Sequence, residues 1–97
     1  MRVIAKKTLR EFWVKHADSQ GQLEAWYNEA KKAVWTTPND IKREYPSASF
    51  IAGNRVVFNI KGNHYRLIVK ISYEYGMVWS RFVGTHKDYD KIDAATV

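Results

Sequence analysis

Residues 55 to 71 carry a clear strand pattern and read Arg55-Val56-Val57-Phe58-Asn59-Ile60-Lys61-Gly62-Asn63-His64-Tyr65-Arg66-Leu67-Ile68-Val69-Lys70-Ile71. Apolar and polar residues alternate through most of it, and a period of two is typical of β-strands. Gly62-Asn63 is a two-residue hairpin signal, because both residue types tolerate the positive φ angles that such turns require. The sequence therefore predicts an antiparallel hairpin formed by the strands Arg55–Lys61 and His64–Tyr73.

The turn also predicts the register of this hairpin. With Gly62 and Asn63 in the turn, Ile60 faces Tyr65, and at the far end Arg55 faces Lys70. Alternation then divides the residues between two faces of the sheet. The apolar face, which we expect on the core side, carries Val56, Phe58, Ile60, Tyr65, Leu67, Val69 and Ile71. The other face carries Arg55, Val57, Asn59, Lys61, His64, Arg66, Ile68 and Lys70.

A third strand, about Met77–Val83, follows a second turn at Glu74-Tyr75-Gly76. A turn of two or four residues there predicts that Lys70 faces Arg81, so that Arg55, Lys70 and Arg81 form one row of cations. Like charges directly opposite one another in a sheet are unfavourable, so such a row indicates a surface for phosphodiesters. The alternative is a solvated sheet face whose long side chains spread apart, and a slip of register would remove the row.

Before the hairpin, residues 2–5 predict a short strand and residues 6–17 a helix with apolar residues at spacings of three and four. Ser19 is the expected N-cap of a second helix, and Thr37-Pro38 predicts a short helical turn over 39–44. Helices grouped before antiparallel strands indicate an α+β fold in a single domain, 1–97. We expect the N-terminal strand and two to three helices to pack on one face of an antiparallel sheet of three to four strands.

The composition narrows the classes of function. The chain has 97 residues, with 16 Lys and Arg against 10 Asp and Glu, and a formal net charge of +6. This charge attracts polyanions, either nucleic acid or an acidic protein partner, although small proteins can also be basic for solubility alone. The chain contains no cysteine, which excludes disulfides, thiolate metal sites and a cysteine nucleophile. No apolar run suggests a signal peptide or a membrane span, so we expect a cytoplasmic protein.

The residues after the third strand suggest chemistry that suits the cationic face. Cleaving RNA without a metal requires a base for the 2′-hydroxyl, cations for the charge that grows at phosphorus, and an acid for the leaving oxygen. His86 follows the strand that carries Arg81 and can serve as base or acid near neutral pH. Tyr89 can orient the base or stack on a nucleobase, and Trp79 is expected on the same face of the sheet as Arg81, where it can stack on a base.

Metal chemistry fits the sequence less well. The three histidines, His16, His64 and His86, form neither an HxH nor an HExxH pattern, and no glycine-rich phosphate loop is present. The tail carboxylates lie beside Lys87 and Lys91, which favours a solvated segment; they are Asp88, Asp90 and Asp93. We therefore expect neither a metal nor another cofactor.

The stretch from Val57 to Leu67, followed by Thr85-His86-Lys87-Asp88-Tyr89-Asp90, resembles the pattern of HigB-type toxins of the RelE-like superfamily. The resemblance extends to the opening strand and the order of the helices. It implies an mRNA interferase that acts on mRNA in the ribosomal A site and is neutralised by a HigA-like helix-turn-helix antitoxin. Members of the superfamily place Arg or Lys on the central strands and His or Tyr near the C-terminus.

The residues in those places are the expected catalytic set: Arg66, Lys70, Arg81, His86 and Tyr89. Further RNA contacts are expected from Arg55, Lys61, His64, Trp79 and Lys87. Two other functions remain open. A non-catalytic RNA-binding or ribosome-binding module would use the same basic face without needing His86. A gyrase-inhibiting relative on the same fold would arrest replication and leave transcripts intact.

Overall fold

The computed structural model describes all of residues 1–97 and contains five strands, four α-helices and one 3₁₀ turn. In chain order they are β1 (Arg2–Ile4), α1 (Lys6–Lys15), η1 (Ala17–Ser19), α2 (Gln20–Lys32), α3 (Pro38–Glu44), β2 (Ser49–Ile51), β3 (Arg55–Ile60), β4 (Tyr65–Ser72), β5 (Met77–Thr85) and α4 (His86–Tyr89). The strands form one sheet in the order β1-β5-β4-β3-β2, in which only β1 pairs in parallel, with β5. This is the predicted α+β arrangement, with one strand more than expected.

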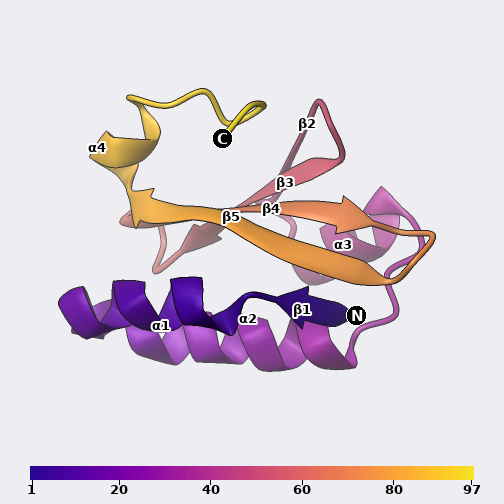
Figure 1. Cartoon of the computed structure of the whole chain (residues 1–97), viewed down its shortest axis with the longest axis horizontal. Coiled ribbons are helices and arrows are strands. Elements are labelled where there is room, and N and C mark those ends of the chain that lie inside the picture. The colour runs from indigo at the N-terminus through magenta and orange to yellow at the C-terminus, as the bar shows by residue number, and fades with distance from the viewer.

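The helices and the chain end lie on opposite faces of the sheet. Helices α1 and α2 cover one face, whereas α4 and the residues after it lie on the other (Figure 1). The main core fills the space between the first two helices and the sheet, where Leu9, Leu23 and Trp26 meet Phe58 and Leu67, all at most 1% exposed. Each such side chain contributes roughly 1.5–3 kcal/mol when fully buried. None of the helices combines the length and the apolar character needed to cross a membrane.

The predicted helices are present, but two details at their ends differ. Helix α1 ends at Lys15 rather than at residue 17, and the chain passes through η1 before α2 begins. Ser19 does not cap α2: it is fully buried in a helical conformation, and its hydroxyl donates to the carbonyl oxygen of His16 at 2.7 Å. Helix α3 does begin at Thr37-Pro38, where the Asp40 carboxylate accepts a hydrogen bond from the main-chain N–H of Thr37 at 3.2 Å.

The β3–β4 hairpin has the predicted register. Ile60 pairs with Tyr65 and Arg55 pairs with Lys70, as the two-residue turn implies. The positive φ angles lie at Lys61 and Gly62, 51° and 61°, and not at Gly62 and Asn63 as expected. The hairpin therefore places Arg55, Arg66 and Lys70 on the face opposite α1 and α2. We call this face of the sheet the open face.

The predicted β4–β5 register is wrong, and the row Arg55–Lys70–Arg81 does not exist. Lys70 pairs with Trp79 instead, because residues 73–76 form the loop and Ser72 pairs with Met77. A register shift follows between Ile68 and Val69, where the partner changes from Phe82 to Ser80 and Arg81 becomes the extra residue of a β-bulge. Beyond the bulge the alternation is reversed, so that Val83 packs against the helix-side core and Phe82 faces the other way.

Candidate functional site

The candidate functional residues of the open face fall into two groups. The first, which we call the α4 cluster, comprises Arg66, His86, Tyr89 and Asp90. The second, the Trp79 hollow, is lined by Lys70, Trp79 and Arg81. Arg66 and Lys70 are four residues apart on β4, which is about 13 Å at a strand rise of ~3.3 Å per residue. The predicted catalytic residues therefore do not surround one point, but lie towards opposite ends of the open face.

Helix α4 is held in place by short-range contacts at the end of β5. The Thr85 hydroxyl accepts a hydrogen bond from the main-chain N–H of Asp88 at 3.1 Å and so caps the helix. The main-chain N–H of His86 donates to the carbonyl oxygen of His64 at 3.1 Å, which ties α4 to the β3–β4 turn. These bonds place His86 at a defined position beside β4 although its side chain is half exposed.

Because Gly84 has no side chain, α4 and the Phe82 ring can pack against this position. A Cβ atom at position 84 would lie 2.5 Å from the Phe82 ring and 3.3 Å from the Cβ atom of Asp88. The first distance is far below van der Waals contact, so a side chain here would push the ring, the helix or both aside. The absence of a side chain at Gly84 therefore helps to set where His86 and Tyr89 lie.

The α4 cluster contains groups that can move a proton and stabilise an anion. Nδ1 of His86 lies 3.1 Å from the carboxylate of Asp90, an arrangement that fixes the ring and leaves Nε2 free. The Arg66 guanidinium lies 5.9 Å from the centre of the Tyr89 ring. Arg66 is 9% exposed and has no carboxylate partner, so its remaining N–H donors are available to an anion.

Asp90 is a candidate site residue that the sequence pattern did not identify. The tail carboxylates Asp88, Asp90 and Asp93 are exposed, as expected for a solvated segment, and Asp90 in addition lies 3.1 Å from Nδ1 of His86. The spacing of four residues was the available signal, since residues at i and i+4 are neighbours on a helix surface.

The Trp79 hollow has a volume of about 180 Å³ and a lining of one indole and two cations. Trp79 lies across from Lys70 in the ladder, and the bulge adds Arg81 on the same strand. Bulges often redirect a side chain next to a functional site. An aromatic surface between two cations suits a nucleotide, because the base can stack while the phosphate meets the charges.

The other expected RNA contacts are placed less favourably. Arg55 is 8% exposed, and its guanidinium donates to the main-chain oxygens of Ala94 and Val97. Lys61 forms an ion pair of 3.5 Å with Asp18, which precedes α2. His64 is exposed at the turn and Lys87 is exposed on α4, so both are accessible beside the α4 cluster.

A hydrogen bond between Tyr65 and Asp18 joins the β3–β4 hairpin to the helix side of the sheet. The Tyr65 hydroxyl donates to the Asp18 carboxylate at 2.5 Å. This bond lowers the pKa of Asp18 below its ordinary value, and the nearby Lys61 ammonium acts in the same direction. The same bond raises the pKa of Tyr65, because the anionic carboxylate disfavours a phenolate.

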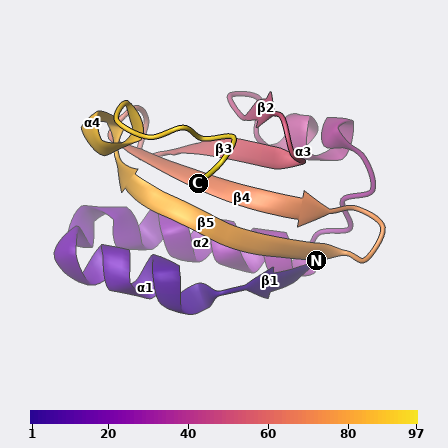
Figure 2. The same ribbon diagram turned by 45° about the horizontal axis from the view of Figure 1, so that its top comes forward.

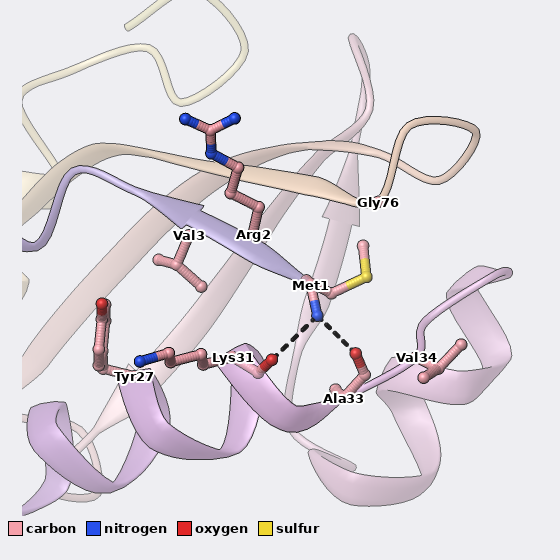
Figure 3. A pocket seen from close by; sticks show the side chains of 8 residues that line it. All are labelled: Met1, Arg2, Val3, Tyr27, Lys31, Ala33, Val34 and Gly76. Atoms are coloured by element: carbon pink, nitrogen blue, oxygen red, sulfur yellow. Dashed lines mark hydrogen bonds between the residues drawn. The ribbon is translucent and has the colours of Figure 1, made fainter.

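The largest hollow lies elsewhere, between β1 and the end of α2, with a volume of about 600 Å³ (Figure 3). The N-terminal ammonium donates across it to the carbonyl oxygens of Lys31 and Ala33. Its lining contains no histidine or carboxylate side chain; the residues are Met1, Arg2, Val3, Tyr27, Lys31, Ala33, Val34 and Gly76. This hollow therefore has no histidine–carboxylate pair like that of the α4 cluster. No set of three His, Asp or Glu side chains comes together as a metal-binding group.

Comparison with known proteins shows the family to which this chain belongs. Residues 19–92 match the family of HigB toxins, the RelE-like toxic component of a toxin–antitoxin system. The match covers most of the chain and includes both open-face groups, and the chain belongs to this family.

Particular relatives are similar over nearly their whole length. The chain is 29% identical over 92 residues to the mRNA interferase toxin HigB of Escherichia coli strain K12, and the alignment covers 93% of this chain and 88% of the relative. The mRNA interferases HigB of Escherichia coli O157:H7 and Shigella flexneri match to the same extent.

Proposed function

We propose that this toxin is an mRNA endoribonuclease that cleaves without a metal ion, by attack of the 2′-hydroxyl on the adjacent phosphate. The chain shares its family with the HigB mRNA interferases, and its open face carries the groups that this reaction needs. The observation that carries the proposal is the α4 cluster. It combines a histidine held by a carboxylate with a nearly buried arginine that has no acidic partner.

The reaction can be divided among these side chains. Nε2 of His86 takes the proton of the 2′-hydroxyl or returns one to the leaving 5′-oxygen, while Asp90 keeps the ring oriented. Arg66 stabilises the charge that develops on the phosphate oxygens. Tyr89, with its ring against Arg66, can stack on a base or supply the second proton-transferring group. Loss of the 2′-hydroxyl proton and protonation of the 5′-oxygen balance, so no cofactor is required.

The Trp79 hollow supplies binding in the same proposal. Trp79 stacks on a base of the strand, and Lys70 and Arg81 bind phosphates on either side of it. A net charge of +6 draws the RNA to this face. Lys70 and Arg81 were expected to be catalytic; their distance from His86 along the sheet favours a binding role instead.

The partners follow from the family. We propose that the substrate is mRNA in the ribosomal A site, in the cytoplasm, and that a HigA-like helix-turn-helix protein is the neutralising antitoxin. The basic surface is complementary to an acidic segment of such a protein as well as to RNA.

The product ends test this proposal. The protein is incubated with a short RNA in EDTA, and with ribosome-bound mRNA in a preparation that tolerates the chelator. We expect cleavage that leaves 2′,3′-cyclic or 3′-phosphate ends, and no cleavage where the nucleotide 5′ to the cut carries a 2′-deoxy group. Cleavage that stops with EDTA and resumes with magnesium would reject the mechanism. RNA that binds but is never cut, on or off the ribosome, would indicate a binding module. Growth arrest with intact transcripts and impaired gyrase would indicate a gyrase inhibitor.

A further inference from the structure

The centre of the open face is covered, although no helix lies over it. Val57 and Ile68 point away from the helix layer and are not part of its core, yet they are 3% and 0% exposed. The chain after α4 turns back and runs over this side of the sheet (Figure 2). Within that segment, residues 91–97, four apolar side chains are partly buried, namely Ile92, Ala94, Ala95 and Val97. We call residues 91–97 the cover segment.

The cover segment contacts Arg81, which the proposed function assigns to RNA, and Arg55, which the sequence predicts as an RNA contact. The Arg55 guanidinium donates through Nη1 to the main-chain oxygens of Ala94 at 3.2 Å and Val97 at 2.5 Å. Nε of Arg81 makes a long contact of 3.5 Å with the same oxygen of Val97. The segment therefore presents main-chain oxygens at a point between Arg55 and Arg81, where a phosphate group would otherwise present its own.

These contacts leave most of the arginine donors unused. A guanidinium carries five N–H donors in a planar fork, and a phosphate accepts two of them at once. Both contacts of Arg55 with the segment come from Nη1, so a phosphate that replaces the main-chain oxygens can engage a second nitrogen. Bases of a bound strand can also cover Val57 and Ile68 when the segment leaves.

Only arginine side chains join the segment to the sheet by hydrogen bonds. Four hydrogen bonds are internal: the main-chain N–H groups of Thr96 and Val97 and the Thr96 hydroxyl donate to the carbonyl oxygen of Asp93, and the N–H group of Ala95 donates to the Asp93 carboxylate. Two more continue from α4, where the N–H groups of Lys91 and Ile92 donate to the carbonyl oxygens of Asp88 and Tyr89. Its link to the sheet rests on the arginine contacts and on partly buried small side chains. Segments with few buried contacts open with a low free energy.

We propose that the cover segment is an intramolecular competitor of RNA: it docks on Arg55 and Arg81 in the free toxin and is displaced when a phosphodiester strand binds. The inference rests on the proposed function and adds a regulation of the same face. In the free state Arg55 anchors the segment, and in the bound state Arg55 contacts RNA.

The test compares the full chain with a chain that ends at Asp90. The deletion removes one lysine and one aspartate, Lys91 and Asp93, so the net charge and the general attraction for RNA are unchanged. The probe is a single-stranded RNA of about ten nucleotides with 2′-fluoro groups, which cannot be cleaved by 2′-hydroxyl attack. We expect the deletion to tighten binding about tenfold, which corresponds to a docked state that outnumbers the open state by about ten to one.

Arg55→Ala supplies the second arm of the experiment. In the full chain this substitution should change RNA affinity little, because it removes an RNA contact and releases the cover segment at the same time. In the chain that ends at Asp90 the same substitution should weaken binding several-fold. Equal losses in both chains would overturn the competition, as would a deletion that weakens binding or leaves it unchanged.

A labelled full chain keeps the test valid if the deletion fails to fold. The protein has no cysteine, so Thr96→Cys, at an exposed position, takes a single spin label. We expect the label to be restricted in the free protein and to become mobile as the 2′-fluoro RNA saturates it. A label that stays restricted at saturation would show that the segment remains docked and would refute the competition. Absence of RNA binding in every variant would instead reject the proposed function itself.

Discussion

The α4 cluster and the Trp79 hollow carry cations on the same sheet face, but they differ in what holds the side chains. In the α4 cluster, His86 contacts Asp90, Arg66 is nearly buried against Tyr89, and the helix is tied to the β3–β4 turn. In the hollow, Lys70 and Arg81 are exposed, and Arg81 makes only one long contact of 3.5 Å, with Val97. Groups held in place before the substrate arrives suit a transition state, whereas exposed cations around an aromatic ring suit the binding of a flexible strand.

The largest expected effect belongs to the cluster. His86→Gln should lower the single-turnover rate on ribosome-bound mRNA by about two to four orders of magnitude, the usual range for a general acid or base. Binding should change little, because glutamine has a similar size and can still form hydrogen bonds. The measurement is the single-turnover rate of the parent and the variant on the same substrate, with RNA affinity measured beside it.

His16→Gln is the matched control, since His16 stacks on Phe12 on the helix side. Its rate should equal that of the parent. If His86→Gln retains its rate within a few-fold, His86 has no catalytic role. The functional distinction between the α4 cluster and the Trp79 hollow is then lost.

Alanine substitutions of Arg66 and Arg81 test whether the α4 cluster acts on catalysis and the Trp79 hollow on binding. Arg66→Ala should lower kcat about 10²- to 10³-fold, by analogy with the loss of one donor to a transition-state anion. Arg81→Ala should act mainly on RNA affinity, by about 10- to 100-fold, the value of a hydrogen bond to a charged group. Both are measured as kcat and KM on one RNA substrate, after circular dichroism has confirmed folding.

Arg10→Ala, an exposed change of the same charge on α1, serves as the control for general electrostatics. If Arg66→Ala and Arg81→Ala lower kcat equally and leave KM alone, the two regions form one catalytic site.

A smaller effect is expected from the indole of the hollow. Trp79→Ala should weaken RNA binding by about 1–3 kcal/mol, the contribution of one stacked base, and Trp79→Phe should restore part of it. Tyr75→Ala is the control, because Tyr75 is 74% exposed in the β4–β5 loop outside the hollow. Equal losses of affinity in Trp79→Ala and Tyr75→Ala would argue against stacking in the hollow.

The smallest expected effect concerns Asp18, which belongs to neither the α4 cluster nor the Trp79 hollow. Because the Tyr65 bond lowers the pKa of Asp18 in the folded chain, Asp18 stabilises the fold above its unfolded pKa of about 3.8, and this contribution is lost as pH falls through the folded pKa. Asp18→Asn should therefore lower the unfolding temperature slightly at neutral pH and progressively less below pH 3.8. A difference that grows at low pH would contradict this sign. RNA cleavage should not change.

The two hairpins show how far the sequence predicts this structure. The β3–β4 register follows from one two-residue turn and regular alternation, so its two faces can be assigned from the sequence alone. The β4–β5 register cannot, because Phe82 and Val83 are both apolar and either can face the core. A bulge at Arg81 settles that choice through tertiary packing. Strand β2 has three residues between a proline turn and a second turn, too few for a pattern to emerge.

The candidate site is predictable in its residue types more than in its arrangement. Open-face positions can be assigned to Arg66 and Lys70 from alternation, and His86 can be placed just beyond the last strand. Their separation into two groups cannot be inferred in this way, because it depends on where α4 folds back. The docking of the cover segment on Arg55 likewise cannot be predicted from the sequence, since seven residues of mixed polarity carry no periodic signal that would direct them onto a sheet.

Gly84 has a consequence for how a cell can escape this toxin. Most substitutions that inactivate the open face remove a charged or aromatic side chain, and the loss of a proposed functional residue can be read from the sequence. A side chain at position 84 would instead displace Phe82 and α4 while every proposed functional residue remains in the sequence. Selection for cells that survive expression of the toxin should therefore recover substitutions of Gly84 in which all proposed catalytic residues are unchanged. Such survivors should still bind RNA through the Trp79 hollow.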